Sequence, residues 1–446
     1  MELTVSSLSD LDLNIASQVR SDYIYMYPPR QAYRFFDPAT AMIKDKVAKS
    51  IRHRGNLNIY IHVPFCRQIC GFCNLYTTNI KSPEVHDAYV AAVLTQIAGV
   101  QEFLSNHIVP TIYFGGGTPT VLARHTLKRL IDGVLSAFPD RTKSCEVAIE
   151  VDPQTVTPGD LEFMRTLGIN RINLGLQTRN NAELKTIGRR YRSLEQWQLA
   201  YDAMSTGFQN VCIDLIYGLP IQTADSWKKS VMECIEFSPQ TICCYPLTER
   251  PHTGFAKSSR MRSSDSDYDM WEFADKELRS AGYERQSHVR WAREGGGYMQ
   301  KELHWGLENL FGFGAGARSY LWDIDLRMNY SIAQRRRALD LYMESINRGE
   351  LIPQEGIVMC TDERLRKAVI LGIHKLDADK VLSSVGIDPI ESFGAVFDGL
   401  SERGLLTTQG RTVALTQTGM KYRDLIVQMF FSERVRQLTT EFSYNE

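Results

Sequence analysis

The chain has 446 residues, and its 51 Lys and Arg residues against 52 Asp and Glu residues give it a formal net charge of -1. With 43% hydrophobic and 23% charged residues it has the composition of an ordinary globular protein, long enough for two or three compact units of about 100–200 residues each. A neutral chain lacks the basic field that attracts nucleic acids or acidic membranes, and no apolar run reaches the length of a membrane helix, so we expect neither a nucleic-acid partner nor membrane insertion.

The nine cysteines indicate a reducing compartment. Three of them lie within eight residues, and six are scattered in apolar contexts at 145, 212, 234, 243, 244 and 360. An odd number with this spacing is typical of buried free thiols and not of a disulfide framework. The N-terminal twenty residues also lack the apolar core of a secretory signal, so the sequence predicts a cytoplasmic protein.

The first 55 residues are predicted to form an N-terminal arm. The stretch "DYIYMYPPRQAYRFF" (22–36) places six aromatic residues and two prolines together. Because a proline disfavours helix in the residue before it, Tyr27, Pro28 and Pro29 are expected to be extended. We favour an arm that packs against another surface over one whose tyrosines contact a substrate directly.

Short apolar runs then alternate with amphipathic stretches. Six runs are predicted as buried strands, at 57–63, 111–116, 146–151, 171–176, 211–218 and 241–247. Strand alternating with helix is typical of a parallel α/β fold, and six units predict an open, partial (βα)6 TIM-like barrel. A doubly wound sheet is the main competitor. In either arrangement ligands bind at the carboxyl ends of the strands.

The predicted domains are the arm (1–55), the partial barrel (56–250), a barrel extension and connecting segment (251–355) and a C-terminal domain (356–446). The extension is less regular and contains the glycine-dense stretch "LFGFGAGARSYL" (310–321). The last segment reads as helices followed by a small β-wing, which predicts a winged-helix-like α+β module. Since that module is not conspicuously basic, we expect it to serve as packing or lid structure and not to bind DNA.

The loop "CRQICGFC" (66–73) carries the strongest chemical signal. Cys66, Cys70 and Cys73 follow the first predicted strand directly, and soft thiolates in a tight loop favour zinc, copper(I) or iron–sulfur clusters. A structural zinc site needs a fourth ligand, and neither His62 nor His86 has a familiar spacing for one. A [4Fe–4S] cluster held by these three cysteines would leave one iron open to a small ligand.

The segment "YIHVPFCRQICGFCN" (60–74) resembles the radical S-adenosylmethionine (SAM) superfamily motif, in the branch of the oxygen-independent coproporphyrinogen dehydrogenases. The likeness continues in order through "YFGGGTPT" (113–120), "IEVDP" (149–153), "NRINLGLQT" (170–178), "IGRRYRS" (187–193), "IDLIYGLPIQT" (213–223) and "GFGAGARSY" (312–320). It implies a [4Fe–4S] cluster whose open iron binds one SAM, which one electron splits to the 5′-deoxyadenosyl radical.

The same resemblance implies a set of cofactor-binding residues. Gly116 and Glu150 correspond to residues beside the first SAM, and Tyr60 flanks the cluster motif. Gly117 and Thr118 would lie nearer a second SAM molecule, and Phe72, Gln177, Arg189 and Asp214 match contacts of that second SAM. Taken singly, each of the charged residues could instead belong to a structural ion pair. Tyr245, Glu249 and His252 follow the sixth strand at the expected substrate rim, and Arg318 stands where relatives often carry histidine.

Two substitutions and the N-terminal arm help to decide which family within this branch the chain resembles. Leu75 occupies the position of a further cysteine in coproporphyrinogen dehydrogenases, and Tyr191 replaces a histidine of haem chaperones. The arm and the "GFCNLYTT" loop resemble class C radical SAM methyltransferases and cyclopropanases. The resemblance therefore implies an enzyme that uses two SAM molecules to methylate or cyclopropanate an sp² carbon of a small aromatic or olefinic substrate. A haem-binding chaperone and a coproporphyrinogen dehydrogenase-like oxidase remain alternatives. A flavodoxin or ferredoxin as electron donor and a monomeric state are also expected.

Overall fold

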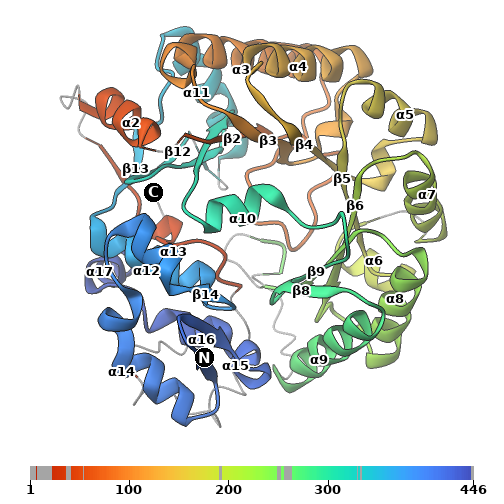
Figure 1. The fold of residues 1–446 in the computed structure, drawn as a ribbon. Helices are drawn as coiled ribbons and strands as arrows, with labels where there is room; N and C mark the ends of the chain where they lie inside the picture. The colour runs from red at the N-terminus through yellow and green to blue at the C-terminus, as the bar shows by residue number, and fades with distance from the viewer. Residues whose placement is uncertain are drawn as a thin grey trace.

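A single large sheet organises the molecule. The computed structural model describes residues 7, 23–36, 42–53, 55–189, 193–248, 253–255, 264–328, 330–331 and 334–442. Thirteen strands form this sheet in the order β1-β13-β12-β11-β10-β2-β3-β4-β5-β6-β7-β9-β8, which curves around a central space and does not close (Figure 1). The α/β class and the partial TIM-like barrel predicted from the sequence are confirmed.

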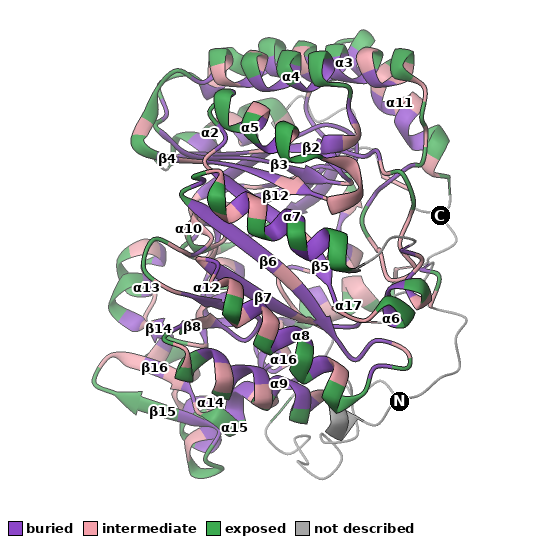
Figure 2. Ribbon diagram, turned by 90° about the vertical axis from the view of Figure 1, so that its right-hand side faces the viewer, coloured by how far each residue is buried: buried purple, intermediate pink, exposed green. Residues whose placement is uncertain are grey.

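Six parallel strands form the middle of the sheet. They are β2 (Leu57–Val63), β3 (Val109–Gly116), β4 (Arg141–Val151), β5 (Arg171–Gln177), β6 (Asn210–Tyr217) and β7 (Thr241–Pro246). Each covers one of the six predicted runs, with differences of a few residues at the ends. Their near-continuous apolar sequences fit strands that are buried on both faces, as Figure 2 shows in purple.

Helices cover the outer face of these strands. They are α3 (Pro83–Leu104), α4 (Arg124–Ala137), α5 (Pro158–Thr166), α6 (Asn181–Thr186), α7 (Ser193–Ser205), α8 (Ala224–Phe237) and α9 (Ser264–Ser280). Several begin with a capping residue: the Ser82 side chain accepts from Val85 N–H, and Thr223 accepts from Ser226 N–H. Exposed residues lie on the outward faces of α3, α4 and α7 in Figure 2.

The sheet extends beyond the six predicted strands at both edges. On one side are β10 (Asn309–Phe313), β11 (Arg318–Tyr320), β12 (Ile324–Arg327), β13 (Glu355–Val358) and β1 (Arg34–Phe35), and on the other are β9 (Arg290–Ala292) and β8 (Glu284–Ser287). β10 runs parallel to β2, from Asn309 opposite Leu57 to Phe313 opposite Ile61. The glycine-dense stretch therefore continues the barrel beside its first strand. The remaining helices of this part are α2 (Met42–Arg52), α10 (Met299–Trp305) and α11 (Arg335–Asn347).

The C-terminal segment forms a helical module with a small antiparallel sheet, drawn in blue in Figure 1. Its sheet has the order β14 (Leu376–Asp377), β16 (Thr412–Leu415) and β15 (Leu406–Gln409). Its helices are α12 (Thr361–Gly372), α13 (Ala378–Val385), α14 (Pro389–Glu402), α15 (Gln417–Lys421), α16 (Arg423–Gln428) and α17 (Glu433–Thr440). In the part of the chain described, no helix combines the length and the apolarity that crossing a membrane requires.

The N-terminal arm packs against the C-terminal module and forms hydrogen bonds with it. The Tyr27 hydroxyl is fully buried and donates to Glu363 Oε2 at 2.5 Å, while it accepts from Ser432 N–H at 3.1 Å. Pro29 is extended, as expected, and a short 3-10 helix (Arg30–Ala32) follows it directly. The backbone N–H of Tyr23 donates to Asp424 Oδ2 at 2.8 Å. The arm thus packs against another surface of the protein, as the sequence predicts.

A buried ion pair joins the module to the barrel. Lys367 on α12 lies 2.9 Å from Asp325 on β12, and both side chains are almost completely buried. Replacing Lys367 by methionine should lower the free energy of unfolding by about 3–5 kcal/mol, because the buried Asp325 loses its partner and must either stay charged and unpaired or take up a proton. Urea unfolding measures this loss. The double variant Asp325→Leu/Lys367→Met should recover most of it, and a single variant as stable as the native chain would contradict the prediction.

Candidate active site

A cavity of about 490 Å³ lies at the carboxyl ends of the parallel strands. It is the place where the predicted site residues from distant segments meet. Its lining includes all of the predicted cluster and cofactor residues, which are Tyr60, Cys66, Cys70, Phe72, Cys73, Gly116, Gly117, Thr118, Glu150, Gln177, Arg189 and Asp214. Co-localisation of twelve residues chosen from the sequence is the main structural finding about the site.

The cysteine loop follows β2 and folds back on itself through backbone hydrogen bonds. Cys66 N–H donates to Thr78 O at 2.8 Å, and Cys73 N–H donates to Cys70 O at 3.1 Å. Gly71 N–H donates to Ile187 O at 3.0 Å, which attaches the loop to the segment after α6. These contacts hold all three thiols, half-buried, against one side of the cavity.

The three loop sulfurs suit a polynuclear cluster better than a single zinc ion. Two thiolates on one tetrahedral zinc lie about 3.8 Å apart, given a Zn–S distance of about 2.3 Å. Among the described residues, the loop sulfurs are not a set whose ligand atoms all lie within 4.8 Å of one another. Burial raises the pKa of the Cys66 thiol to about 12 and that of Cys73 to about 11, so metal binding has to displace their protons. The donor set therefore fits a [4Fe–4S] cluster.

Two glycines allow the second strand to approach the loop closely. A Cβ on Gly116, whose φ is +106°, would lie 2.4 Å from the His62 ring. A Cβ on Gly117 would lie 2.6 Å from the carbonyl oxygen of Phe65. Gly117 N–H donates to Val63 O at 2.8 Å, and the Thr118 hydroxyl donates to Cys66 Sγ at 3.5 Å. The glycine turn thus supports the cysteine loop directly.

Glu150 lies late in β4 and faces the cavity. Its carboxylate accepts from Gly116 N–H and from the Tyr113 hydroxyl, both at 3.0 Å. Burial outweighs these two hydrogen bonds and raises the pKa of Glu150 to about 7. Near neutral pH the carboxyl group is therefore divided between its two protonation states, and a cationic ligand would favour the ionised form.

Tyr60 is oriented by a buried histidine. His62 Nε2 lies 2.8 Å from Tyr76 O, and His62 Nδ1 lies 3.0 Å from the Tyr60 hydroxyl. Burial lowers the pKa of His62 to about 4, so the ring is neutral. Because a carbonyl only accepts, Nε2 carries the proton and Nδ1 accepts from the Tyr60 hydroxyl. The oxygen of Tyr60 is then left as an acceptor for a ligand.

A second polar group lies on the neighbouring strands. Between Gly175 and Gln177 the pairing of β5 with β6 shifts, and Gln177 takes a left-handed conformation with φ 68°. A bulge of this kind redirects a side chain, here into the cavity. Arg189 donates to Gly175 O, and a Cβ on Gly175 would lie 2.7 Å from Gln177 Nε2. Asp214, opposite Gly175, completes the group, and burial raises its pKa to about 6.

The cavity wall also includes residues that the sequence did not single out. Tyr23 and Tyr25 of the arm line it, together with Tyr298 and Lys301 from α10 and its N-terminal flank. The arm therefore both packs and lines the site. Its aromatic density was the available signal, whereas α10 is a short helix in an irregular region and offered none. The tyrosines in the lining are Tyr23, Tyr25, Tyr60, Tyr76, Tyr113, Tyr245, Tyr298, Tyr320 and Tyr330.

Of the remaining residues discussed from the sequence, some line the cavity and others lie outside the described part of the chain. Tyr245 and Arg318 line the cavity, as does Leu75. Glu249, His252 and Tyr191 lie outside the described residues. The Arg318 guanidinium is buried against Tyr320, to whose hydroxyl it donates at 3.5 Å.

Comparison with known proteins identifies similar chains. Residues 60–234 match the model of the radical SAM superfamily. The chain is 32% identical over 269 residues to the heme chaperone HemW of Lactococcus lactis, covering 59% of this chain and 69% of the relative. It is 25% identical over 382 residues to HemW of Bacillus subtilis, covering 84% and 99%. The solved structure of coproporphyrinogen III oxidase (HemN) from Escherichia coli superposes with a TM-score of 0.79 at 22% identity, covering 96% of this chain and 99% of that one.

Proposed function

Because the chain belongs to the radical SAM superfamily, in the branch of HemW and the HemN-like coproporphyrinogen oxidases, we propose that it cleaves SAM reductively and acts on a planar, unsaturated small molecule held in its cavity. One observation carries this proposal. The three-thiol loop, Glu150 and the group of Gln177, Arg189 and Asp214 share one tyrosine-lined cavity.

When bound, a [4Fe–4S] cluster would supply the single electron that splits SAM into methionine and the 5′-deoxyadenosyl radical. Cys66, Cys70 and Cys73 would hold it. Glu150 and the Tyr60 hydroxyl would accept from the cationic and hydroxyl groups of SAM, and the glycine turn would let the backbone approach it. The apolar and aromatic wall would exclude water from the reacting atoms. A flavodoxin or ferredoxin is the proposed electron donor.

The pH dependence of SAM binding tests the role of Glu150. Binding a cation requires the carboxylate, and burial raises the pKa of Glu150 to about 7. As pH falls below 7, SAM must displace a proton, so its affinity should fall by up to about tenfold per pH unit, and it should level off above 7. Titrations of the cluster-loaded protein between pH 5.5 and 8.5 measure this. Glu150→Gln should bind more weakly with a flat profile, and a flat native profile would contradict the prediction.

The relatives support a tetrapyrrole as the ligand. HemW is a heme chaperone and HemN a coproporphyrinogen III oxidase, and both fit the alternatives considered from the sequence better than C-methylation does. The tyrosine-rich wall agrees with a planar ligand, because aromatic side chains stack on flat π-systems. A heme-binding or porphyrinogen-oxidising role is therefore the first candidate for the substrate class.

Methyl or methylene transfer from a second SAM is the second candidate. Leu75 lies in the cavity wall where the oxidases carry a further cysteine, and Gln177, Arg189 and Asp214 form a separate polar group across the same space. An arginine and a carboxylate on one side suit a zwitterionic ligand such as a second SAM. The cavity would then hold the methyl group of the second SAM close to the adenosyl carbon of the first.

One anaerobic assay separates these candidates. Protein with reductant and CD₃-SAM should yield 5′-deoxyadenosine. Deuterium in that product, together with S-adenosylhomocysteine once the substrate is present, supports methyl transfer. Unlabelled product formed with coproporphyrinogen supports an oxidase. Stoichiometric heme binding with no SAM cleavage under any reductant supports a chaperone and overturns the enzymatic proposal.

A further inference from the structure

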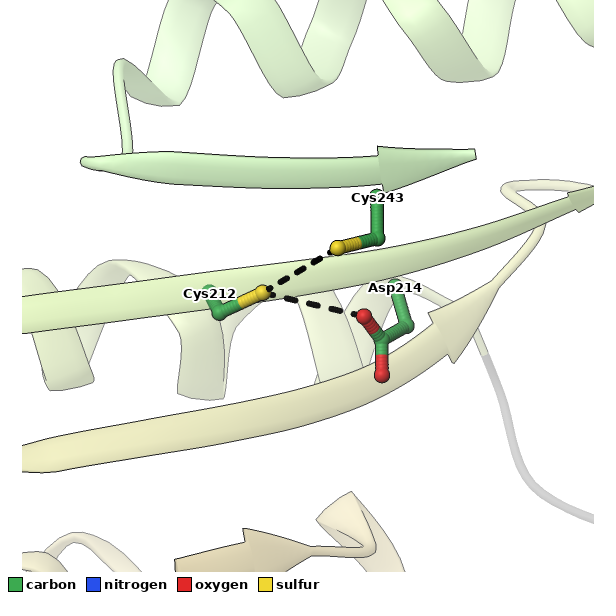
Figure 3. Close-up of side chains that lie close together, drawn as sticks. All are labelled: Cys212, Asp214 and Cys243. Atoms are coloured by element: carbon green, nitrogen blue, oxygen red, sulfur yellow. Dashed lines mark hydrogen bonds between the residues drawn. The ribbon is translucent and has the colours of Figure 1, made fainter. Parts of the chain in front are cut away.

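Three ligand-bearing side chains converge beneath the floor of the cavity. Cys212 and Asp214 lie on β6 and Cys243 on β7, and in the register of these strands Asp214 lies opposite Cys243. Figure 3 shows the three side chains pointing toward one another. Cys212 Sγ lies 3.7 Å from Cys243 Sγ and 3.7 Å from Asp214 Oδ1. Their ligand atoms all lie within 4.8 Å, a property no other such group has among the described residues.

The two cysteines are poorly placed for a disulfide. Cys212 pairs with Thr241, two residues before Cys243. Strands about 4.8 Å apart with a rise of about 3.3 Å per residue put the two Cα atoms about 8 Å from each other. A disulfide requires about 4.4–6.8 Å. In contrast, thiolates about 3.8 Å apart are what a single tetrahedral zinc ion requires, and the observed sulfur separation is close to that value.

Asn173 supplies a fourth polar atom without a partner. It lies on β5 directly opposite Cys212, and the residue is 5% exposed. Its Oδ1 atom is buried and has no hydrogen-bond partner. Buried amide oxygens are almost always satisfied, so this oxygen is able to accept a water or a metal ion.

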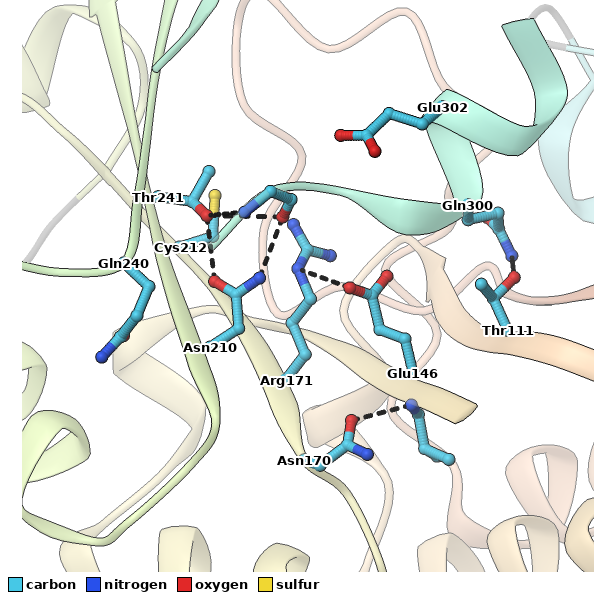
Figure 4. A network of polar contacts seen from close by, with 12 residues as sticks. Thr111, Glu146, Asn170, Arg171, Asn210, Cys212, Gln240, Thr241, Gln300 and Glu302 are labelled. Carbon is cyan, nitrogen blue, oxygen red and sulfur yellow. Dashed lines mark hydrogen bonds and ion pairs between the residues drawn. The ribbon is translucent and has the colours of Figure 1, made fainter. Parts of the chain in front are cut away.

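The surroundings can balance the charge of a metal site. Arg171 is completely buried, and all three of its guanidinium nitrogens lack a hydrogen-bond partner. It lies in the polar network of Figure 4, 3.6 Å from Glu146 and beside Cys212. Two thiolates and a carboxylate around a divalent cation leave one negative charge, which the Arg171 guanidinium, shared with Glu146, stabilises in part. Uncompensated buried charge is otherwise costly.

We propose that Cys212, Asp214 and Cys243 form a binding site for one thiophilic divalent cation of the zinc class, with Asn173 Oδ1 at the fourth position. Two soft sulfur ligands favour zinc over magnesium or calcium. Asp214 and Asn173 also line the cavity, so the ion reaches the site from that side. The site is separate from the cysteine loop and does not depend on SAM cleavage, but it shares Asp214 with the proposed second-SAM group, so zinc and a second SAM would compete for that carboxylate.

The test uses protein that already carries its iron–sulfur cluster, so that the loop cysteines are occupied. Zn²⁺ is titrated anaerobically against a competing chelator, and zinc and iron are counted per chain. The native protein should retain about one zinc in addition to its iron. Cys212→Ser and Cys243→Ser should each lose it with no change in iron. Bound zinc should also protect Cys212 and Cys243 of the native chain from alkylation, as read by mass spectrometry.

Cys244→Ser is the matched control. Cys244 is equally buried on the same strand, next to Cys243 but with its side chain on the opposite face. This variant should keep the zinc. A native protein that retains no zinc, or that retains the same zinc after Cys212→Ser, overturns the proposal. Alkylation of the native chain that zinc does not slow also overturns it. None of these outcomes affects 5′-deoxyadenosine formation, so the proposed function is tested separately.

Discussion

Replacing Cys73 by alanine should abolish the formation of 5′-deoxyadenosine and leave the protein folded. The thiol lies in a loop whose backbone is held by hydrogen bonds that do not involve the side chain, such as Cys73 N–H to Cys70 O. Two thiolates cannot replace three as ligands of a cluster with one open iron. Anaerobic incubation with reductant and SAM, followed by chromatography, measures the product, and iron content measures cluster assembly.

Cys360→Ala is the control for this experiment, because Cys360 is an exposed free thiol outside the cavity. It should keep the native rate and iron content. Product formation by Cys73→Ala above the no-enzyme background would show that the loop is not the site of SAM cleavage.

The second large effect is expected for Gly117→Ala. The added Cβ would lie 2.6 Å from Phe65 O and 2.7 Å from Val63 O, which are backbone atoms that cannot rotate away. The turn must then move away from the cysteine loop, and the contact of Thr118 with Cys66 is lost. A displacement of about 1 Å at a reacting centre costs on the order of 100-fold in rate. The rate of SAM cleavage should fall by at least that factor.

Gly55→Ala is the matched change, since a Cβ at Gly55 meets no atom within 4 Å. It should cleave SAM at the native rate. A Gly117→Ala variant with native activity would mean that this close approach does not position the cluster or SAM.

The parts of the fold visible in the sequence are those that depend on local pattern. The strand at 57–63 is a continuous apolar run, and its burial on both faces requires such a run. The cysteine spacing is equally local, and it located the loop on the correct end of β2. The glycines beside it reflect a close approach that the structure shows at Gly116 and Gly117.

What the sequence did not predict depends on contacts between distant segments. β10 has only five residues and is a strand because it pairs with β2, about 250 positions away along the chain. Tyr298 reaches the cavity because α10 packs across the barrel, and Gln177 does so through a bulge that no local signal marks. The groups around Arg171, Glu146 on β4 and the Tyr298 ring before α10, likewise come from separate segments that only the folded chain brings together.

The attachment of the N-terminal arm has a consequence for biosynthesis. Asp424 holds the backbone of Tyr23 and Ile24, residues that precede it by 401 and 400 positions, and Tyr23 forms part of the cavity wall. During translation the ribosome must release residue 424 before this wall can be sealed. In a polypeptide that ends before Asp424, the cavity around the cluster would therefore remain open to solvent, where a radical would be quenched. Synthesis of the C-terminal module is therefore required before the cavity can shield a radical from solvent.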